Sequence, residues 1–370
     1  MPALLPGYEL DPASIVSAVD GQSDPATQDA AVRIVVRRSP LSDDELDAIA
    51  LLYGPADAKY GDRAFLRQLY DVAPYGGGLH AFAREGEDYV GHVSVIPLPA
   101  LIGAQQVPSG KYEAFAVADA ARSAASEDGV PIAVALLAAV TDTAEAQGIH
   151  LLHGMTNEQI GFLLRLAGCR RIALRDPMFS GVVDATRFAD RVSGWRRLAV
   201  ASAATFGGVT SAITRVGARV LFAATATIAD PVGSDAATLT SGASGWTVDP
   251  TECWDWLRHV GDLRVLSIHG RRPSRILIRP PRSEDDDLHI LGWCSGGAVT
   301  IGALLALAHA RKLGGRAVRV QCWQPGNASA VARACRLLGF VPRPAGAFYV
   351  RSRTFDPGAV GFNPFFYAMF

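Results

Sequence analysis

Lysine is almost absent from this chain of 370 residues: only Lys59, Lys111 and Lys312 occur, and all other Lys+Arg positions are arginine. Cysteine is also scarce, with five residues and no C-x-x-C spacing. That pattern favours free thiols in a reducing cytoplasm and argues against a zinc site. We therefore expect a cytoplasmic protein that binds no metal, and the first 20 residues show no basic segment of a secretion signal.

Long uncharged apolar runs are missing as well. A membrane-spanning helix needs about 18 such residues, and the nearest candidate, residues 198–214, has 17 and is flanked by arginines. We interpret it as a linker or a buried helix rather than a membrane contact. The sequence thus predicts no transmembrane segment.

A strong excess of one charge is absent from the whole chain but present in each half. The net charge is −1, yet residues 1–190 carry 14 basic and 25 acidic side chains, and residues 191–370 carry 21 and 11. Length and charge asymmetry together indicate two domains. Residues 264–282 hold six arginines, but three aspartates follow at 285–287. We interpret this stretch as a solvated strand face, so nucleic acid is not an expected partner.

Hydrophobic periodicity and turn residues predict an order of elements in the first half, and the second half repeats much of that order. After a loosely held tail at residues 1–30, the first half should contain strands at 31–37, 79–84, 89–96, 111–117, 149–155 and 169–175. Its first helix should begin at a capping box formed by Ser42 and Glu45. Further helices should lie at 63–72, 131–147 (capped by Asp128 or Gly129) and 158–167. In the second half, the same signals predict strands at 263–269, 274–279, 288–293, 317–323 and 347–353. They predict helices at 250–260, 298–313 and 328–338.

A repeat of this length predicts two similar domains. We expect domain 1 at residues 31–178, a linker with an apolar helix at 179–245, and domain 2 at 246–370 with an aromatic C-terminal tail. The fold class is α/β (α+β), with each domain a mixed twisted sheet flanked by helices. The second half carries Trp246, Trp254, Trp256, Trp293 and Trp323, which we assign mainly to packing rather than to an acceptor pocket.

Four short motifs in residues 89–169 give this order a more specific meaning. They are Tyr89-Val90-Gly91-His92-Val93, Ala116-Val117, Gly148-Ile149, and Asn157 followed eleven residues later by Gly168. Together they resemble strands three, four and five and the Asn-led helix of the GCN5-related N-acetyltransferases (GNAT). The segment from Asn327 to Gly339-Phe340 repeats the last element. The resemblance covers residues 31–178 and, more weakly, 246–353, and it implies two tandem GNAT-like domains.

The resemblance implies acetyl-CoA or another acyl-CoA as co-substrate, without a metal. A helix N-terminus after a glycine-rich loop would face the pyrophosphate, and parted strands four and five would pair with the pantetheine arm. The family loop Gln/Arg-x-x-Gly-x-Gly/Ala falls on Asp128 to Ala133, where Asp128 replaces the basic or amide residue and Pro131 replaces a glycine. The implied binding residues are Phe115, Ala116, Val117, Arg122 (to replace the missing positive charge), Asp128, Gly129, Val130, Ile132, Ala133 and Asn157. Asn157 is equally an ordinary helix cap, and Ser295-Gly296-Gly297 is interpreted as a structural turn.

Acetyl transfer to an amine needs a base that takes a proton. By period two, Lys111, Glu113, Phe115 and Val117 should share one strand face, and Glu113 is the best base candidate. Its alternative is a salt-bridged strand glutamate. His153 and His92 are further catalytic candidates, with a structural role as their alternative.

The family's usual acid, a tyrosine on the Asn-led helix, is replaced by Leu164 in the first half and Cys335 in the second. Water or another donor such as Tyr112 would have to protonate the leaving thiolate.

These observations predict an acyl-CoA-dependent N-acyltransferase that transfers acetyl directly to the amine of a small molecule, such as an amino sugar or a biosynthetic intermediate. Domain 1 would hold the cofactor and domain 2 would shape the acceptor pocket, and a homodimer stays open. The alternative is a non-catalytic GNAT-like binding or scaffold protein with a degenerate CoA loop. A third hypothesis takes the donor from a carrier or a tRNA, because tandem domains of this type also resemble the peptide-bridge transferases.

Overall fold

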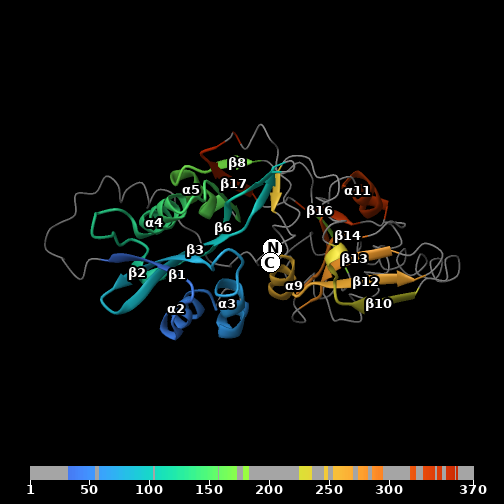
Figure 1. The fold of residues 1–370 in the computed structure, drawn as a ribbon, viewed down its shortest axis with the longest axis horizontal. Coiled ribbons are helices and arrows are strands. Elements are labelled where there is room, and N and C mark those ends of the chain that lie inside the picture. The colour runs from blue at the N-terminus through green and yellow to red at the C-terminus, as the bar shows by residue number, and fades with distance from the viewer. Residues whose placement is uncertain are drawn as a thin grey trace, which may run out of the picture. The chain divides into compact units, whose positions relative to one another are not determined.

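The computed structural model describes residues 32–54, 58–102, 105–156, 158–172, 178–182, 225–235, 246–248, 253–269, 274–281, 286–294, 317–321, 328–337, 340–343, 347–354 and 356. They form two compact units (Figure 1). The first contains the described residues from 32 to 172 and from 347 to 356, and the second contains those from 178 to 343. Within these residues, no helix is long and apolar enough to cross a membrane.

The first unit is a seven-stranded mixed sheet with the order β1-β2-β3-β6-β7-β17-β8. All neighbouring strands are antiparallel except β6 and β7, which are parallel. The strands are β1 (Arg33–Arg38), β2 (Leu79–Glu85), β3 (Asp88–Pro97), β6 (Ser109–Val117), β7 (Leu151–Thr156), β8 (Arg170–Ile172) and β17 (Ala347–Ser352). A separate short pair follows β3: β4 (Ala100–Ile102) and β5 (Gln105–Val107).

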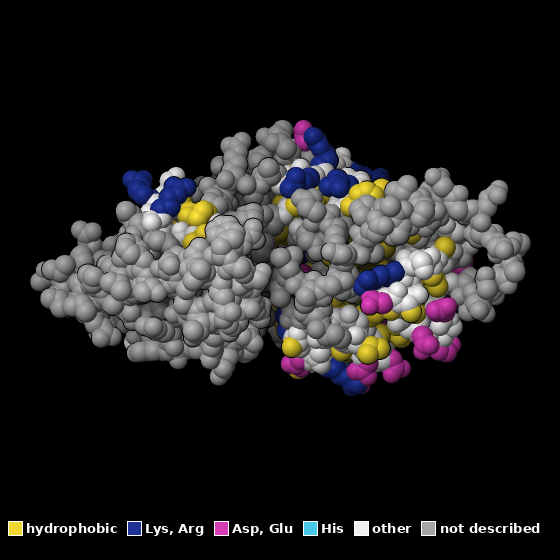
Figure 2. Space-filling view, turned by 180° about the vertical axis from the view of Figure 1, so that it is seen from behind, with side chains coloured by type: hydrophobic (Ala, Val, Ile, Leu, Met, Phe, Trp, Pro, Cys, Tyr) yellow, Lys and Arg dark blue, Asp and Glu magenta, His cyan; other side chains and the backbone are white. Residues whose placement is uncertain are grey.

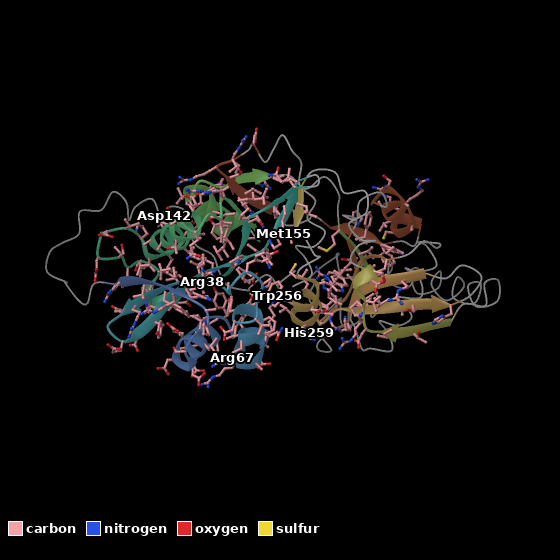
Figure 3. The ribbon with its side chains drawn as sticks, in the orientation of Figure 1. Arg38, Arg67, Asp142, Met155, Trp256 and His259 are labelled. Carbon is pink, nitrogen blue, oxygen red and sulfur yellow. The ribbon has the colours of Figure 1, made fainter. Side chains whose placement is uncertain are left out.

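Helices cover both faces of this sheet. The helices are α2 (Asp43–Tyr53), α3 (Arg63–Tyr70), α4 (Ile132–Ala146) and α5 (Glu158–Leu166), with short 3-10 turns η1 (Ala58–Gly61) and η2 (Asp119–Ala121). The predicted capping box is confirmed, because the Ser42 hydroxyl accepts from the Glu45 N–H and the Glu45 carboxylate accepts from the Ser42 N–H. Asp142 on α4 and Arg67 on α3 lie on opposite sides of the sheet (Figure 3).

The two faces differ in chemistry. On the α4 face, alternate strand residues and the helix form one apolar cluster that includes Val93, Val95, Tyr112, Leu136 and Leu137. On the α2/η1/α3 face, several strand residues are polar and nevertheless buried: His80, His92, Ser94, Lys111 and His153. Burying polar groups costs free energy unless they have hydrogen-bond partners. The α2/η1/α3 face is therefore the candidate location of a functional site.

The second unit repeats the topology of the first. Its sheet has the order β10-β12-β13-β14-β15-β9-β16, again with one parallel pair, β14 and β15. The strands are β9 (Met178–Val182), β10 (Thr225–Ala229), β12 (Arg264–His269), β13 (Ser274–Arg279), β14 (Leu288–Trp293), β15 (Ala317–Gln321) and β16 (Val341–Arg343). The remaining elements are β11 (Trp246–Val248), α9 (Trp254–Val260) and α11 (Ala328–Leu337).

Each sheet contains one strand from the other half of the chain. β17, at the C-terminal end, inserts between β7 and β8 of the first sheet, and β9 inserts between β15 and β16 of the second. The contiguous division at residues 178 and 246 therefore differs from the compact units: strand 347–352, which the sequence assigned to domain 2, completes the first sheet. Arg351 fixes it there, donating from Nε to Glu145 of α4 (2.8 Å) and from an Nη to the Ala167 carbonyl.

Several sequence expectations lie outside the described residues: the tail 1–30, the apolar segment 198–214, the helix 298–313, the turn 295–297, Asn157, Asn327 and the aromatic C-terminal tail. Trp254, Trp256 and Trp293 are buried, consistent with packing. Strands β4, β5, β9, β10, β11 and β16 were not predicted, and all are five residues or shorter.

Several charged side chains on the described surface form ion pairs. On the first unit, Arg63 of α3 pairs with Asp47 of α2, and Arg67 pairs with Asp43 and Asp71; acidic and basic side chains stand together on the surface drawn in Figure 2. In the basic stretch of the second unit, Arg264 pairs with Asp230, Arg275 with Asp235, and Arg279 lies 4.0 Å from Asp286.

Candidate functional site

The parallel strands β6 and β7 separate in the middle of the first sheet. Their register runs Ser109–Leu151, Gly110–Leu152 and Lys111–His153, and no further pair forms between the described residues of the two strands. Beyond that point β6 pairs only with β3, and β7 only with β17. The strand gap, which we define as the space between Tyr112–Val117 of β6 and Gly154–Thr156 of β7, therefore opens immediately after Lys111. Met155 of this gap is labelled in Figure 3.

A bulge in β6 lies beside the strand gap. Ser94 of β3 faces Glu113 and His92 faces Ala116, so two β6 residues lie opposite one, and Ala114 adopts a positive φ of 47°. An extra residue shifts the alternation of side chains between faces. The prediction that Phe115 and Val117 share the face of Lys111 and Glu113 is consequently wrong: both pack against the α4-side cluster that contains Tyr112.

Glu113 lies in a buried network of hydrogen bonds on the α2/η1/α3 face. The Lys111 ammonium is 2.5 Å from its Oε2, and the side chains of Lys111 and Glu113 are 5% and 13% exposed. Tyr60 of η1 donates its hydroxyl hydrogen bond to Oε1. Ser94 donates to the Glu113 backbone carbonyl at 2.9 Å. The carboxylate is thus held from two sides, at a residue of β6 that borders the strand gap.

The charges of this network affect one another. Burial raises the pKa of Glu113, but Lys111, Lys59 and the two hydrogen bonds outweigh burial, so the pKa lies below its ordinary value. Burial lowers the pKa of Lys111 to about 8, although Glu113 opposes the shift. Burial and Glu113 both raise the pKa of Tyr60, which therefore stays a hydrogen-bond donor. Glu113 is an ionised carboxylate at neutral pH, as a base must be.

The two histidine candidates are neutral. Burial, and secondarily Lys111, lower the pKa of His153 to about 3, and its ring stacks near Phe348 of β17 with centroids 6.0 Å apart. Burial and the neighbouring His80 hold the pKa of His92 well below its ordinary value. His92 Nε2 lies 3.1 Å from His80 Nδ1.

The surroundings of His92 are aromatic: its ring contacts those of Tyr53, Tyr70, His80 and Phe82. The second nitrogen of His80 lies 3.2 Å from the Ser39 hydroxyl. His92 therefore joins a buried cluster, while His153 lies beside Lys111 at the start of the strand gap.

The loop before α4 folds differently from a phosphate cradle. The Gly129 N–H donates to the Ser126 carbonyl and the Ser126 N–H donates to the Val130 carbonyl, both at 2.8 Å, which closes a tight hairpin. The N-cap of α4 is Pro131, with no side-chain cap bond, so the expectation of a cap by Asp128 or Gly129 is wrong. The Ile132 N–H donates to the Ala124 carbonyl at 3.3 Å.

The side chains of this loop also leave little for a phosphate. Arg122 forms an ion pair with Asp119, Asp128 is exposed, Ile132 is buried and Ala133 is half-buried. At the start of α4, Pro131 has no N–H group, and the N–H groups of Gly129 and Ile132 are already bonded to backbone carbonyls. None of these three positions therefore offers a phosphate an N–H donor. This loop thus does not offer a pyrophosphate the N–H groups that the family pattern implies.

The residues discussed for the acid role lie in other clusters than the Glu113 network. Leu164 is buried in the α4-side cluster, and Cys335 is buried in the second unit. The Tyr112 hydroxyl lies 2.8 Å from the Thr141 hydroxyl of α4, on the opposite face of the sheet from Glu113. Sequence reasoning missed Tyr60 and Lys59. The scarcity of lysine was a usable signal, because two of the three lysines in the chain act on Glu113.

In the second unit the described residues of the parallel pair align as Leu288–Val318, His289–Arg319 and Ile290–Val320. Ile290 and Val320 are buried and apolar. On this ladder the partly exposed Arg319 pairs with the buried Asp287 at 2.5 Å. Among the residues that the structure describes in either unit, no three His, Cys, Asp or Glu side chains lie close enough to hold a metal ion.

Solved structures with this architecture are known. A tandem GNAT protein from the clavulanic acid biosynthesis pathway matches with a TM-score of 0.52 and 14% identity, over 88% of this chain and 99% of that chain. A probable N-acyltransferase of unknown function from Enterococcus faecalis gives 0.51 and 11%, over 88% and 74%. A GCN5-related N-acetyltransferase from Anabaena variabilis gives 0.50 and 14%, over 86% and 73%.

Neither family models nor curated protein sequences match the chain. The structural likeness nevertheless shows the fold: the chain has two tandem GNAT-like domains of mixed α+β class, as the sequence predicted.

Proposed function

We propose that the protein is an acyl-CoA-dependent N-acyltransferase that acts on a small-molecule amine. The observation that carries this proposal is the strand gap of the first unit, which opens one residue after Lys111 and beside the ionised Glu113. A gap in a sheet exposes strand backbone groups that must find partners. An ionised carboxylate at its edge is the group that an amine acceptor needs.

The co-substrate would lie along β6. Backbone groups of Phe115, Ala116 and Val117, which β7 does not pair, would hydrogen-bond the amides of a pantetheine arm, and the bound thioester would supply an activated acyl group. Because the loop before α4 offers few N–H groups, we expect the nucleotide end to contribute less affinity than the arm. Fold analogy supports the acyl class but not the acceptor.

The residues of the network have separate tasks in this proposal. Glu113 would bind the acceptor amine and take the proton that nitrogen releases as the N–C bond forms. Lys111 and Tyr60 would hold the carboxylate ionised and oriented. His153, neutral and buried at the start of the gap, would shape the site without exchanging a proton.

Calorimetry with acetyl-CoA and longer acyl-CoAs, followed by a free-thiol assay with a panel of amines, tests the proposal. Glu113→Gln keeps the size of the side chain and removes the base, so turnover should fall by about 100-fold or more while acyl-CoA binding persists. Glu127→Gln, at an exposed acid of the loop, is the matched control. Absence of binding by every acyl-CoA at millimolar concentration would reject the proposal.

A non-catalytic binding protein is the second candidate, and the loop before α4 favours it. Its hairpin uses the N–H of Gly129, and Pro131 has none to offer. That protein would bind an amide-containing ligand in the strand gap and release no thiol with any amine. Binding of desulfo-CoA or pantetheine without turnover of acetyl-CoA would select this candidate over the enzyme.

A further inference from the structure

Lysine occurs at very few positions in this chain. One of these lysines, Lys111, is buried at the end of the β6–β7 ladder. Of the 35 basic side chains only three are lysine, and Lys111 is 4% exposed. Arginine stays protonated at every accessible pH, whereas a buried lysine can lose its proton and become a nucleophile. A lysine at this position therefore brings a reactivity that the arginines of the protein do not have.

The position of Lys111 relative to the strand gap is favourable for that reactivity. Lys111 forms the last pair with β7, opposite His153, so its neighbour Tyr112 already borders the gap. Its ammonium nitrogen lies 2.5 Å from Glu113 Oε2, on the same face as the proposed base. An acyl group delivered to an amine at Glu113 is consequently delivered close to Lys111.

We infer that Lys111 is a self-acylation site of the protein, modified by the thioester that binds in the strand gap. This inference rests on the proposed function. The neutral amine of Lys111 attacks the thioester carbonyl, an N–C bond forms and the C–S bond breaks. The proton lost by nitrogen passes through Glu113 to the leaving thiolate, so the products are an N-acyl-lysine and a free thiol.

The protonation of Lys111 sets the expected rate. With a pKa of about 8, roughly a quarter of the amine is neutral at pH 7.5, against roughly 0.1% for an ordinary lysine with a pKa of about 10.4. Lower basicity makes each neutral amine a weaker nucleophile, which reduces this advantage. We expect acylation of Lys111 at least about 10-fold faster than that of Lys312.

Acylation would also change Glu113. The modified side chain carries no charge, so Glu113 loses its nearest cation, and its pKa rises because burial is then opposed only by Lys59 and the Tyr60 hydrogen bond. A raised pKa makes the carboxylate a stronger base. Self-acylation would thus alter the pH dependence of transfer to an external amine.

The experiment uses the full chain, acetyl-CoA, and a small thioester that lacks the nucleotide, N,S-diacetylcysteamine. Intact mass and peptide mapping follow acetylation of each of the three lysines between pH 6.5 and 9. Lys111→Arg keeps the charge and removes the nucleophile, and Lys312→Arg is the matched control. The acidic limb of the kcat/KM profile is measured before and after labelling, and circular dichroism verifies that each variant is folded.

Acetylation confined to Lys111, increasing through pH 8, absent in Lys111→Arg and unchanged in Lys312→Arg, is the expected result. If the small thioester acetylates Lys111 and acetyl-CoA does not, Lys111 is still the site of modification, but acetyl-CoA is rejected as the co-substrate. Transfer to an external amine without acetylation of Lys111 would overturn the inference and leave the proposed function standing. Equal labelling of all three lysines, or no labelling at all, would also overturn it.

Discussion

Three buried histidines make the first unit sensitive to acid, and His153 provides the sharpest test. His80, His92 and His153 are all 0% exposed. Burial lowers the pKa of His80 and of His153 to about 3 and lowers that of His92 in the same direction. Below pH 6.5 the unfolded chain binds protons at these residues and the folded unit does not, so the free energy of unfolding falls as the pH falls.

The magnitude follows from the pKa difference. A pH of 5 is about 1.5 units below the pKa of about 6.5 that a histidine has in the unfolded chain. Each buried neutral histidine therefore lowers the free energy of unfolding by about 2 kcal/mol at pH 5 relative to neutral pH. His80 and His153 together remove about 4 kcal/mol, and His92 adds to that. Typical proteins have about 5–15 kcal/mol in total, so the first unit should approach unfolding near pH 4–5. His153→Gln should reduce the loss between pH 7.5 and 5 by about 2 kcal/mol.

Urea unfolding with pulse-labelling hydrogen exchange, read on β7 peptides at several pH values, measures this quantity for the first unit alone. His150→Gln is the control, because the His150 side chain is exposed three residues earlier. Slopes against pH are compared rather than absolute stabilities, since a glutamine side chain packs differently from the imidazole. Equal slopes for wild type and His153→Gln would refute a neutral His153. Such a result would restore His153 as a titrating catalytic candidate.

Three further predictions concern the network and the sheet. Tyr60→Phe removes the hydrogen bond to Glu113, so the acidic limb of the kcat/KM profile should move to higher pH, while Tyr75→Phe at an exposed tyrosine should leave it in place. Gly161→Ala puts a Cβ into the Tyr349 hydroxyl, whereas Gly233→Ala meets nothing within 4 Å; thermal denaturation should show a loss of about 1–3 kcal/mol for the first only. A chain that ends at residue 345 lacks β17 between β7 and β8 and should lose the first unit's protection from proteolysis, but a chain that ends at residue 356 should keep it.

Local signals in the sequence were sufficient for most elements near the site. The capping box at Ser42 and the helices α3, α4 and α5 depend on residues within a few positions of one another. Strands β2, β3 and β6 were placed within two residues of their observed ends. Alternation also predicted that Glu113 and Lys111 share a face, which the structure shows.

Long-range and irregular features were not predictable in the same way. The bulge at Ala114 inverts the alternation after Glu113, and no turn residue marks it in the sequence. The exchange of β9 and β17 depends on pairing across more than 130 residues, which periodicity cannot reveal. Tyr60 reaches Glu113 from 53 positions away, so only the fold brings the two together.

The two faces of the first sheet differ in what burial achieves. In both sheets four antiparallel strands lead to one parallel pair. Leu152 in the first parallel ladder, and Ile290 and Val320 in the second, are buried in apolar clusters, the arrangement that packing alone favours. On the other face of the first sheet the ladder ends in Lys111 and His153, which are buried at a cost in stability that an apolar pair would avoid. The proposed function accounts for that cost, because it assigns both residues to the site beside the strand gap.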